Sequence, residues 1–440
     1  MSQLMLGTSK RNITPPVGAW MAGYGARDHG AEGVCDELHA RVLVLDDGST
    51  RAAIICRDLC DVEEHEMQML AARLQERTGL GREQVLVANT HTHSGPSTHY
   101  TEDAKNRDYV ENLADVLVGA VVEASAAMRP ATLACAARPV QCGINRREKT
   151  ADGRMILGCN PDGPCDAVAD ILCFADPESG EPLATLFRHA VHGVVMGSDN
   201  YLISGDLPGA AERFVERNVC GPAAFLSGCC GDINAHPRGS FEAVELLGRR
   251  LGGAVCQGTT ELDEPRAEVK LACVRHELEL PVEPLPPAEE SATIVTELEE
   301  KMRAIEEGDQ TLSRWHTERQ LRRARERVEA AEAGTEITGK PMALQVLAMG
   351  DIALIGYPCE VFFRIGEAVQ ERSPFGHTLT VTHVDGWHGY VPTADAYSDG
   401  GYEVDMARAN HMGLGILPQS ETVLVEESLK ALERAKAGMG

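Results

Sequence analysis

The sequence predicts a large mixed α/β fold, in which α+β layers are built on a mixed sheet within one domain over residues 1–440. Three observations predict this fold. Short apolar runs recur along the chain, segments with helical periodicity separate many of them, and other runs follow one another directly. A strictly doubly wound sheet would alternate strands and helices throughout, so a layered mixed sheet is favoured.

The expected strands are short runs rich in Val, Ile, Leu and Ala, bounded by turn-forming or charged residues. They cover residues 42–45, 52–56, 85–88, 133–136, 169–174, 183–187, 223–226, 269–274, 344–349, 352–355 and 378–382. The expected helices have apolar residues every three or four positions, and they cover 62–78, 107–128, 207–218, 242–258, 361–372 and 420–437. Gly350-Asp351 separates two of the strands and predicts a β-hairpin there.

Residues 285–338 differ in composition from the rest of the chain. A cluster of prolines leads into Glu-rich and then Arg-rich sequence, with Ile294, Leu298, Met302 and Ile305 spaced as one apolar helix face. We predict a charged helical hairpin inserted within the domain. Two interpretations are open. The hairpin is either a solvated excursion packed on the core by that stripe, which is favoured, or an arm that binds a partner.

The composition of the chain restricts which binding partners and which cellular compartment we expect. Asp plus Glu number 67 and Lys plus Arg number 41, so the formal net charge is −26, which disfavours nucleic acid and anionic membranes. The N-terminus lacks a basic region followed by a long apolar one, and no segment is long enough for stable membrane insertion. The cysteines form no CxxC pair and lie mostly in apolar runs. We expect a reduced, soluble, cytoplasmic protein.

Two histidines lie two residues apart in Asn89-Thr90-His91-Thr92-His93-Ser94-Gly95-Pro96, directly after the apolar run 85–88. On an extended segment, side chains two residues apart share a face, so both rings would point into one cleft. The Ser-Gly-Pro sequence ends the strand and keeps the pair near a surface opening. The pair indicates a metal site, for which zinc is the commonest fitting ion. The alternative is a pair of hydrogen-bonded strand histidines without a metal.

Two further segments carry imidazole or carboxylate groups beside glycines. His189 and His192 follow the run 183–187 and would share a face on a helical turn, although either alone is more often a core histidine. Asp206 lies just before Pro208, where a helix is expected to begin. It would either cap that helix or orient a histidine that binds metal.

Two more segments add thiols, a carboxylate and phenols. Cys229 and Cys230 are either nucleophiles or, as is commoner directly after a strand, inert buried thiols; the Gly-x-Ser-x-Gly elbow of serine hydrolases is absent at this turn. Glu360 opens a helix after a strand, so it is either an ordinary first-turn acid or an oxygen ligand for zinc. Phenols concentrate in the same part of the chain, at Tyr357, Tyr390, Tyr397 and Tyr402.

Together these segments resemble the catalytic domain of the neutral/alkaline non-lysosomal ceramidase family. Each segment alone is weakly specific, whereas their order and spacing together are specific, and they cover nearly the whole chain. The resemblance rests on residues 12–18, 23–25, 91–96, 145–146, 192–193, 204–209, 231–232, 358–360 and 389–402. The immunoglobulin-like domain that follows the catalytic domain in well-known members is not expected, because the last predicted helix ends the chain.

The resemblance implies one zinc ion per chain, held by His91, His192, Glu360 and Tyr390. It also implies a different role for the second histidine of the strand-end pair. In this family the residue that matches His93 contacts the reacting carbonyl group rather than the metal.

The resemblance extends to further catalytic positions and fails at one of them. Arg146 is expected to fix a polar group of the substrate, and Tyr402 to stabilise the oxyanion. The family pattern Gly-Asp-x-Ser ends here in Asn234, so no serine is available as a nucleophile or to hold a water. Asn234 would still orient a water or donate to a carbonyl oxygen.

These observations lead us to expect a metal-dependent amidohydrolase that acts on a linear amide, with a small or non-ceramide N-acyl compound as its substrate. An aromatic content of 4% and the negative charge give little sign of a surface that docks on lipid. Three alternatives are open. They are a lipid amidase or ceramidase proper, an ester or lactone hydrolase using the same site, and a non-catalytic homologue that binds metal.

Overall fold

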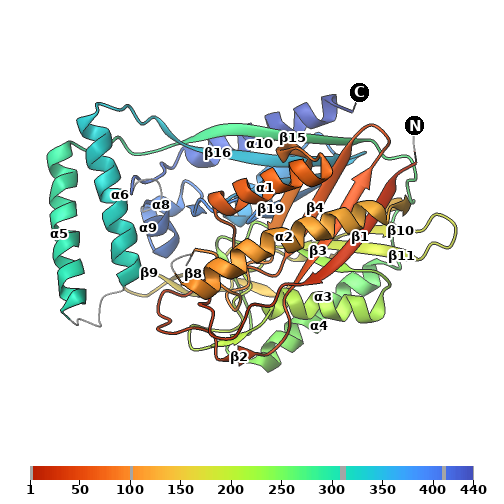
Figure 1. Cartoon of the computed structure of the whole chain (residues 1–440), viewed down its shortest axis with the longest axis horizontal. Helices are drawn as coiled ribbons and strands as arrows, with labels where there is room; N and C mark the ends of the chain where they lie inside the picture. Colours follow the sequence, from red (N-terminus) through yellow and green to blue (C-terminus); the bar gives the residue numbers. More distant parts are fainter. Residues whose placement is uncertain (1–2, 100–102, 308–313, 409–412, 440) are drawn as a thin grey trace.

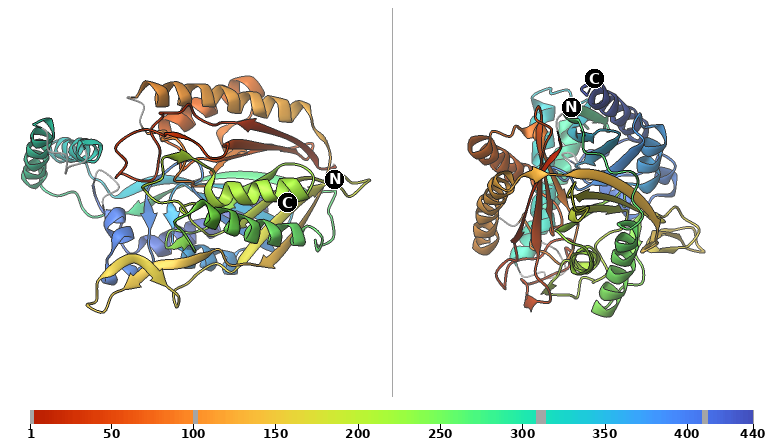
Figure 2. Two further views of the ribbon diagram at one scale, coloured as in Figure 1. Left: turned by 90° about the horizontal axis from the view of Figure 1, so that it is seen from below. Right: turned by 90° about the vertical axis from the view of Figure 1, so that its right-hand side faces the viewer.

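Three large sheets meet at a common core in the computed structural model, and each carries helices on its outer face (Figure 1; Figure 2). The structure describes residues 3–99, 103–307, 314–408 and 413–439. Parallel and antiparallel strand pairs occur in all three sheets. The predicted class, a layered mixed α/β fold, is therefore confirmed.

The first sheet has the strand order β5-β4-β3-β1-β6. Its strands are β1 (Met5–Asn12), β3 (His39–Asp46), β4 (Arg51–Arg57), β5 (Val85–Asn89) and β6 (Arg129–Pro130). Helix α1 (Glu64–Thr78) and the short 3-10 helix η1 (Arg82–Gln84) connect β4 to its parallel neighbour β5. Helices α1 and α2 (Ala104–Ala126) pack on β3 and β4, and the four elements share one apolar cluster.

The second sheet has the order β13-β11-β10-β7. Its strands are β7 (Thr132–Pro139), β10 (Val168–Ala175), β11 (Pro182–His189) and β13 (Ala223–Ser227), and its helices are α3 (Asp206–Asn218) and α4 (Phe241–Gly258). The third sheet has the order β15-β16-β17-β19. Its strands are β15 (Leu271–Pro281), β16 (Gly339–Met349), β17 (Ile352–Tyr357) and β19 (His377–Thr382), with helices α7 (Phe363–Arg372) and α10 (Ser420–Ala437).

Smaller elements connect the large sheets around the site. They are the three-stranded sheet of β14 (Ile233–Ala235), β8 (Gly143–Lys149) and β9 (Met155–Asn160), and the pairs β12 (Leu202–Ile203) with β2 (Gly33–Val34) and β18 (Glu360–Val361) with β20 (Tyr390–Val391). Two short helices, α8 (Ala396–Asp399) and α9 (Tyr402–Arg408), follow β20.

The central core lies between the three sheets. Leu45 of the first sheet, Phe174 of the second and Leu354 of the third belong to one cluster of buried side chains. Full burial of each such side chain is worth about 1.5–3 kcal/mol, so the common core fixes the sheets relative to one another. This arrangement holds the strand ends, and the groups that follow them, in place.

All the expected strands and helices are present, with ends displaced by a few residues. The hairpin at Gly350-Asp351 is also confirmed, because Met349 pairs with Ile352 and Gly350 has a φ of 62°. The sequence patterns missed β1, β8 and β9 among the longer strands. These strands lack a regular alternation of apolar and polar residues, so their pairing depends on distant partners.

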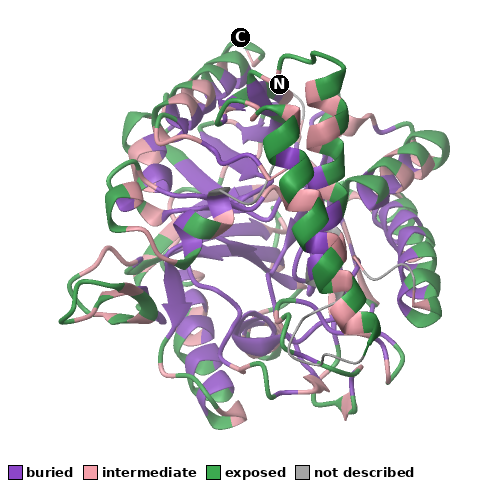
Figure 3. Ribbon diagram, turned by 90° about the vertical axis from the view of Figure 1, so that its left-hand side faces the viewer, coloured by how far each residue is buried: buried purple, intermediate pink, exposed green. Residues whose placement is uncertain are grey.

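Residues between β15 and β16 form the helices α5 (Ala288–Glu306) and α6 (Arg314–Glu332), which pack on each other at one end of the molecule (Figure 1). Their small apolar cluster contains Leu298, Leu321 and Ala324 and is separate from the central core. Figure 3, which faces this end, shows much of the pair exposed in front of the buried strands. Residues 308–313 lie outside the described residues.

The strands that precede the chemically active segments end close together. Strand β5 leads to the paired histidines, β11 to the segment with His192, and β17 to Glu360. Among the described residues, no helix combines the length and apolar character needed to cross a membrane.

Candidate active site

The first histidine pair leaves the buried strand β5 through a sharp turn rather than an extended segment. The backbone turns at His91, whose φ of 59° lies in the left-handed region. Such a conformation costs a residue other than glycine about 1–3 kcal/mol and persists only where its surroundings enforce it. The His91 Nδ1–H donates to the Cys60 carbonyl oxygen at 2.8 Å. This bond fixes the tautomer, so His91 Nε2 presents a lone pair.

His192 follows β11 and packs directly against the His91 turn. A Cβ at Gly193 would lie 2.8 Å from the His91 carbonyl oxygen, so the close approach of the two segments requires glycine at this position. The His192 Nδ1–H donates to the Ile233 carbonyl oxygen at 3.0 Å. Its other nitrogen, Nε2, lies 3.1 Å from Glu360 Oε2.

Glu360 completes a compact set of three donor groups. Its Oε2 lies 3.7 Å from His91 Nε2 and 3.1 Å from His192 Nε2. One donor atom from each of the three residues lies within 4.8 Å of the other two. The other carboxylate oxygen, Oε1, accepts the indole N–H of Trp387 at 3.0 Å.

This donor set fits a zinc ion. Two imidazoles and a carboxylate are donors that zinc commonly takes, and both histidines commit Nδ1–H to a backbone carbonyl. Ligands of a metal usually have such outer partners, because these partners fix the tautomer and the ring orientation. The hydrogen bond of Trp387 to Glu360 orients the carboxylate in the same way.

The protonation states also suit a metal. Burial and the nearby charge of Arg146 lower the pKa of His192 to about 4, so this ring is neutral at pH 7. Burial alone would raise the pKa of Glu360, but the contact of its carboxylate with His192 Nε2 and the neighbouring imidazoles hold it well below its usual range. Burial raises the pKa of Tyr390 well above 10, although the charge of Arg146 opposes this effect. The cluster thus presents a neutral imidazole, a carboxylate and a protonated phenol.

His93 differs from His91 in how its ring is held. His93 Nε2 lies 3.1 Å from His91 Nε2. Because His91 carries its hydrogen on Nδ1, the hydrogen between the two rings belongs to His93 Nε2. The His93 Nδ1 is buried and has no hydrogen-bond partner within the described part of the chain. Gly23 makes room for the ring, since a Cβ there would lie 2.2 Å from His93 Cγ.

Arg146 links the predicted residues of the site from strand β8. Its Nη2 donates to the Tyr390 hydroxyl oxygen at 3.0 Å, and its Nη1 lies 3.2 Å from Asn234 Oδ1 and 3.3 Å from His192 Nε2. Its Nε donates to Glu403 Oε1 at 2.7 Å. Arg146 is 4% exposed, so its guanidinium acts within the protein rather than at the surface. The structure therefore brings Arg146, Tyr390 and Asn234 together.

Only two of the concentrated phenols reach the site. The rings of Tyr390 and Tyr402 meet edge to face, with centroids 5.7 Å apart. Tyr402 is 44% exposed, and burial of its hydroxyl with the charge of Glu360 raises its pKa to about 12. Tyr397 instead donates to a backbone carbonyl oxygen at 2.9 Å, and Tyr357 is fully buried in the core.

His189 and Asp206 lie outside the donor set. His189 ends β11 and donates Nδ1–H to the Val168 carbonyl oxygen at 2.9 Å, so it shares no helical face with His192. The Asp206 carboxylate accepts the backbone N–H groups of Val195 and Met196, both at 3.0 Å. It therefore orders the segment after His192, rather than orienting that ring directly. Helix α3 has Gly205 as its N-cap, without a side-chain cap.

The paired cysteines have the properties of inert thiols. Cys229 and Cys230 are both fully buried. Burial raises the pKa of each thiol to about 12, so neither is a thiolate near neutral pH. The structure thus favours the structural interpretation of this pair.

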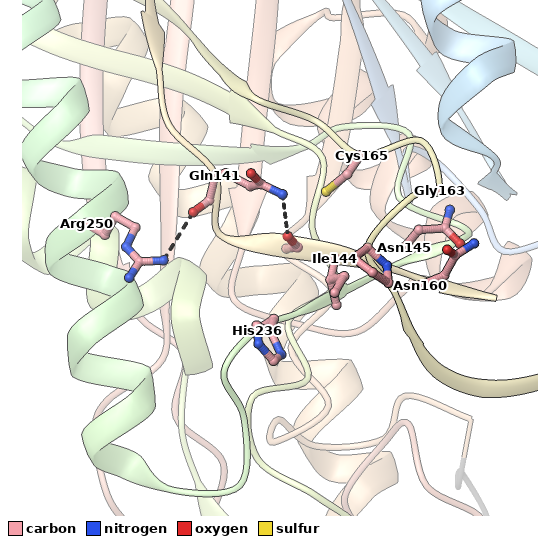
Figure 4. Close-up of a pocket in the computed structure, with 10 residues that line it drawn as sticks. Gln141, Ile144, Asn145, Asn160, Gly163, Cys165, His236 and Arg250 are labelled. Atoms are coloured by element: carbon pink, nitrogen blue, oxygen red, sulfur yellow. Dashed lines mark hydrogen bonds between the residues drawn. The ribbon is translucent and has the colours of Figure 1, made fainter. Parts of the chain in front are cut away.

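A cavity of about 440 Å³ lies beside β8 (Figure 4). Its lining includes Asn145, Cys165, His236 and Arg250, and Arg250 donates to the Gln141 carbonyl oxygen. None of the predicted zinc ligands lines this cavity.

Three further residues belong to the site and were not selected from the sequence. Trp387 binds Glu360, Glu403 binds Arg146, and the ring of His383 stacks on that of His91. His383 directly follows strand β19, so the strand-end rule that selected the other histidines would also have found it. Neither Trp387 nor Glu403 has a comparable local signal, because each acts through a partner distant in sequence.

The chain matches a family of known proteins over more than half of its length. The sequence model described as "Neutral/alkaline non-lysosomal ceramidase, N-terminal" matches residues 4–240. Neutral ceramidase A of Dictyostelium discoideum is 28% identical over 272 residues, which is 54% of this chain and 37% of that protein. Neutral ceramidase 2 of Arabidopsis thaliana is 27% identical over 225 residues, 48% of this chain and 30% of that protein. The matched region thus spans about a third of these relatives.

Solved structures share the fold. The crystal structure of neutral ceramidase from Pseudomonas aeruginosa superposes with a TM-score of 0.72 and 20% identity, covering 99% of this chain and 75% of that chain. A ceramidase complexed with C2 superposes with a TM-score of 0.74 and 18% identity, covering 100% and 76%. On the family match, together with the shared fold, this chain belongs to the neutral/alkaline non-lysosomal ceramidase family.

Proposed function

We propose that this protein is a zinc-dependent hydrolase that cleaves the carbon–nitrogen bond of a linear amide. One observation carries the proposal. His91 and His192 each commit Nδ1–H to a backbone carbonyl and present Nε2 toward Glu360. A purely structural pair of buried histidines would have no need to converge with a carboxylate on one point.

His91, His192, Glu360 and Tyr390 would hold the ion. Zinc bound there supplies a Lewis acid and lowers the pKa of a water to about 7. Tyr390 would bind as the phenolate, and the guanidinium of Arg146 beside its hydroxyl oxygen favours loss of that proton. The four side chains come from three separate regions of the chain, so the site forms only when these regions fold together.

His93 would act on the substrate rather than on the ion. Burial and the neighbouring imidazoles hold its pKa well below its usual range, so the ring is neutral. Its hydrogen lies on Nε2, which faces His91 Nε2 at 3.1 Å. When that lone pair of His91 is engaged, His93 Nε2–H is free to donate to the carbonyl oxygen of an amide. The hydroxyl of Tyr402 is a second donor, and each well-placed donor stabilises the oxyanion by about 3–4 kcal/mol.

The remaining groups would orient other residues of the site and protonate the leaving amine. The leaving amine needs a proton, which His93 or a neighbouring carboxylate would return. Arg146 is buried, and its Nε, Nη1 and Nη2 are all engaged by side chains of the site. We therefore assign Arg146 to the orientation of Tyr390 and Asn234, instead of to the substrate group that the sequence suggested.

We favour a small or polar N-acyl compound as the substrate. Asn234 replaces the serine of the family, and its amide oxygen already accepts from Arg146. Near the donor set, His99 contacts the edge of Trp387 and binds Asp61, with Nε2 3.0 Å from Oδ1. Charged groups this close to Glu360 suit a polar substrate better than an acyl chain. The second candidate is a lipid amide, which the names of the curated relatives favour.

Metal analysis followed by a substrate panel tests the proposal. Purified protein is expected to hold about one zinc ion per chain, as a single set of four ligands implies. N-acyl amides of increasing chain length, with matched esters and lactones, then separate the candidates. Activity that falls with chain length supports the small substrate, and activity that rises supports a ceramidase. Full activity in metal-free protein contradicts the proposal, and bound zinc without turnover on any substrate indicates a non-catalytic homologue.

A further inference from the structure

His383 lies flat against the proposed metal ligand His91. The two ring centroids are 3.6 Å apart and the planes differ by 12°. His383 is fully buried, and its φ of 58° is in the left-handed region, as is that of His91. Its carbonyl oxygen accepts the backbone N–H of Asn89 at 3.2 Å and the side-chain amide of Asn89 at 2.8 Å. Asn89, the last residue of β5 before the turn with His91, thus also anchors the segment with His383.

The ring of His383 interacts through its face. Neither ring nitrogen has a hydrogen-bond partner among the described residues, although both are buried. The face that lies against His91 is therefore the contact through which the ring of His383 meets the site.

His91 needs a second constraint if its lone pair is to point in one direction. The hydrogen bond of its Nδ1 to Cys60 fixes one atom of the ring and leaves the plane free to tilt about that contact. The rings of His93 and His192 meet His91 edge-on, at 81° and 71°, and therefore do not define its plane. The parallel stack with His383 is the contact that does so.

We propose that His383 is a positioning residue of the metal centre, and that its stacked ring holds the plane of His91 so that Nε2 stays directed at the ion. The inference rests on the proposed zinc site and adds a residue to it. His383 does not belong to the set of donors formed by His91, His192 and Glu360. Its effect is therefore on how tightly the ion is bound, through the orientation of one ligand.

Two substitutions separate the stacked face from the ring nitrogens. His383→Phe keeps a flat ring and removes both nitrogens, whereas His383→Leu keeps a similar volume and removes the ring. Zinc affinity is measured by chelator competition on metal-stripped protein, and the cobalt-loaded forms are compared by their visible absorption spectra. We expect His383→Phe to stay close to wild type. We expect His383→Leu to lose affinity about tenfold or more, with an altered cobalt spectrum, as outer-shell changes commonly do.

His189→Leu is the matched control. His189 is also a fully buried strand-end histidine, but it binds the Val168 carbonyl and lies outside the donor set. It is expected to lower thermal stability without changing zinc affinity. If His383→Leu does not fold, His383→Met makes the same comparison with a flexible apolar chain.

Equal zinc affinity in wild type and His383→Leu would overturn the proposal, because the stack would then have no effect on the ion. A loss in His383→Phe as large as that in His383→Leu would also overturn it, since a ring nitrogen would then be required. These results differ from failure of the proposed function. In that case the wild-type protein itself would bind no zinc.

Discussion

Arg146 and Tyr390 belong to two separate small sheets, and a hydrogen bond of 3.0 Å joins Nη2 of the first to the hydroxyl oxygen of the second. The guanidinium carbon also lies 5.4 Å from the centre of the phenol ring. Burial raises the pKa of Tyr390, and the cation opposes that rise. A phenol is a rare metal ligand, so this pairing gives a physical reason for its presence beside Glu360.

Replacement of Arg146 by Met is expected to abolish most turnover and to weaken zinc binding about tenfold, because Tyr390 loses the partner that orients it. Stability should fall by about 3 kcal/mol, since Glu403 is left buried with one cation fewer. Arg147→Met is the matched control. Arg147 binds the other oxygen of Glu403 at 2.8 Å but has no contact with Tyr390. If both variants lose turnover equally, Arg146 has no specific role at the site.

The two histidines of the strand-end pair should respond differently to substitution. His91→Ala and Glu360→Ala are each expected to lose most of the metal, because each removes a ligand. His93→Ala is expected to keep the metal and lose turnover, because His93 provides a hydrogen to the substrate instead. Metal content and kcat measured on the same samples check the assignment. If His93→Ala alone loses the metal, the two roles are inverted.

Asn234 is expected to set the preference between short and long acyl chains. Asn234→Ser would remove the amide that binds Arg146 and introduce the hydroxyl typical of the family. We predict a change of about tenfold in the ratio of kcat/KM values for long and short N-acyl amides, in favour of the long chain. Asn234→Ala, which has no hydroxyl, is the control and should lower both values together. A ratio unchanged in Asn234→Ser would show that another residue determines the preference.

Three of the candidate donor residues could be singled out from the sequence because they obey one rule. His91, His192 and Glu360 each follow a buried strand, and such strand ends meet at one edge of an α/β fold. The groups that orient these side chains could not be predicted from the sequence. The hydrogen-bond partners of the two rings are the carbonyl oxygens of Cys60 and Ile233, and any residue type supplies a carbonyl.

Strand β8, in contrast, could not be predicted from the sequence. Its sequence, Gly-Ile-Asn-Arg-Arg-Glu-Lys, has no apolar alternation and a dense run of charges, so it does not read as a strand. In the structure, Arg146 and Arg147 are both buried against Glu403, which lies far along the chain. Such a strand is stable only once its ionic partner is in place, and a local pattern cannot reveal that partner.

His99 provides a prediction of how stability depends on pH. Burial alone would lower its pKa, but the charge of Asp61 and the hydrogen bonds that the ring donates to Asp61 and Glu63 raise it to about 10. The unfolded value is about 6.5, so the folded protein binds this proton more tightly. The stability that His99 contributes is therefore fully present below about pH 6.5 and lost as the pH rises through about 10.

The free energy of unfolding of His99→Gln should accordingly fall furthest below that of wild type near pH 6, and the difference should shrink toward pH 10. Urea unfolding at several pH values, with both proteins in the same metal state, measures it. Asp61→Asn should weaken the same pH dependence because it removes the main charge that holds the proton. A difference between wild type and His99→Gln that stays constant over this range would contradict the assignment.

The helices α5 and α6 should be removable without loss of the fold or of the metal site. Strands β15 and β16 pair along their whole length, and Pro281 lies opposite Gly339. The segment between them therefore leaves and returns at neighbouring positions. Leu285 and Ile337 pack on the core of the third sheet, so replacement of residues 286–336 by a short Gly/Ser linker keeps both. The apolar cluster that is lost, with Leu298, Leu321 and Ala324, is separate from the other cores.

The shortened protein is expected to keep its zinc affinity and its thermal unfolding temperature, and to hydrolyse a short amide as the full chain does. The reason is that α5 and α6 have a small core of their own, and their removal leaves β15 and β16 joined as a closed hairpin. Thermal unfolding, zinc titration and kcat/KM on the same preparation give the three readouts. A shortened protein that folds and binds zinc but gains activity on bulky amides would mean that α5 and α6 restrict access to the site. Loss of zinc affinity in a folded shortened protein would instead make the two helices part of the metal centre's support, contrary to the prediction.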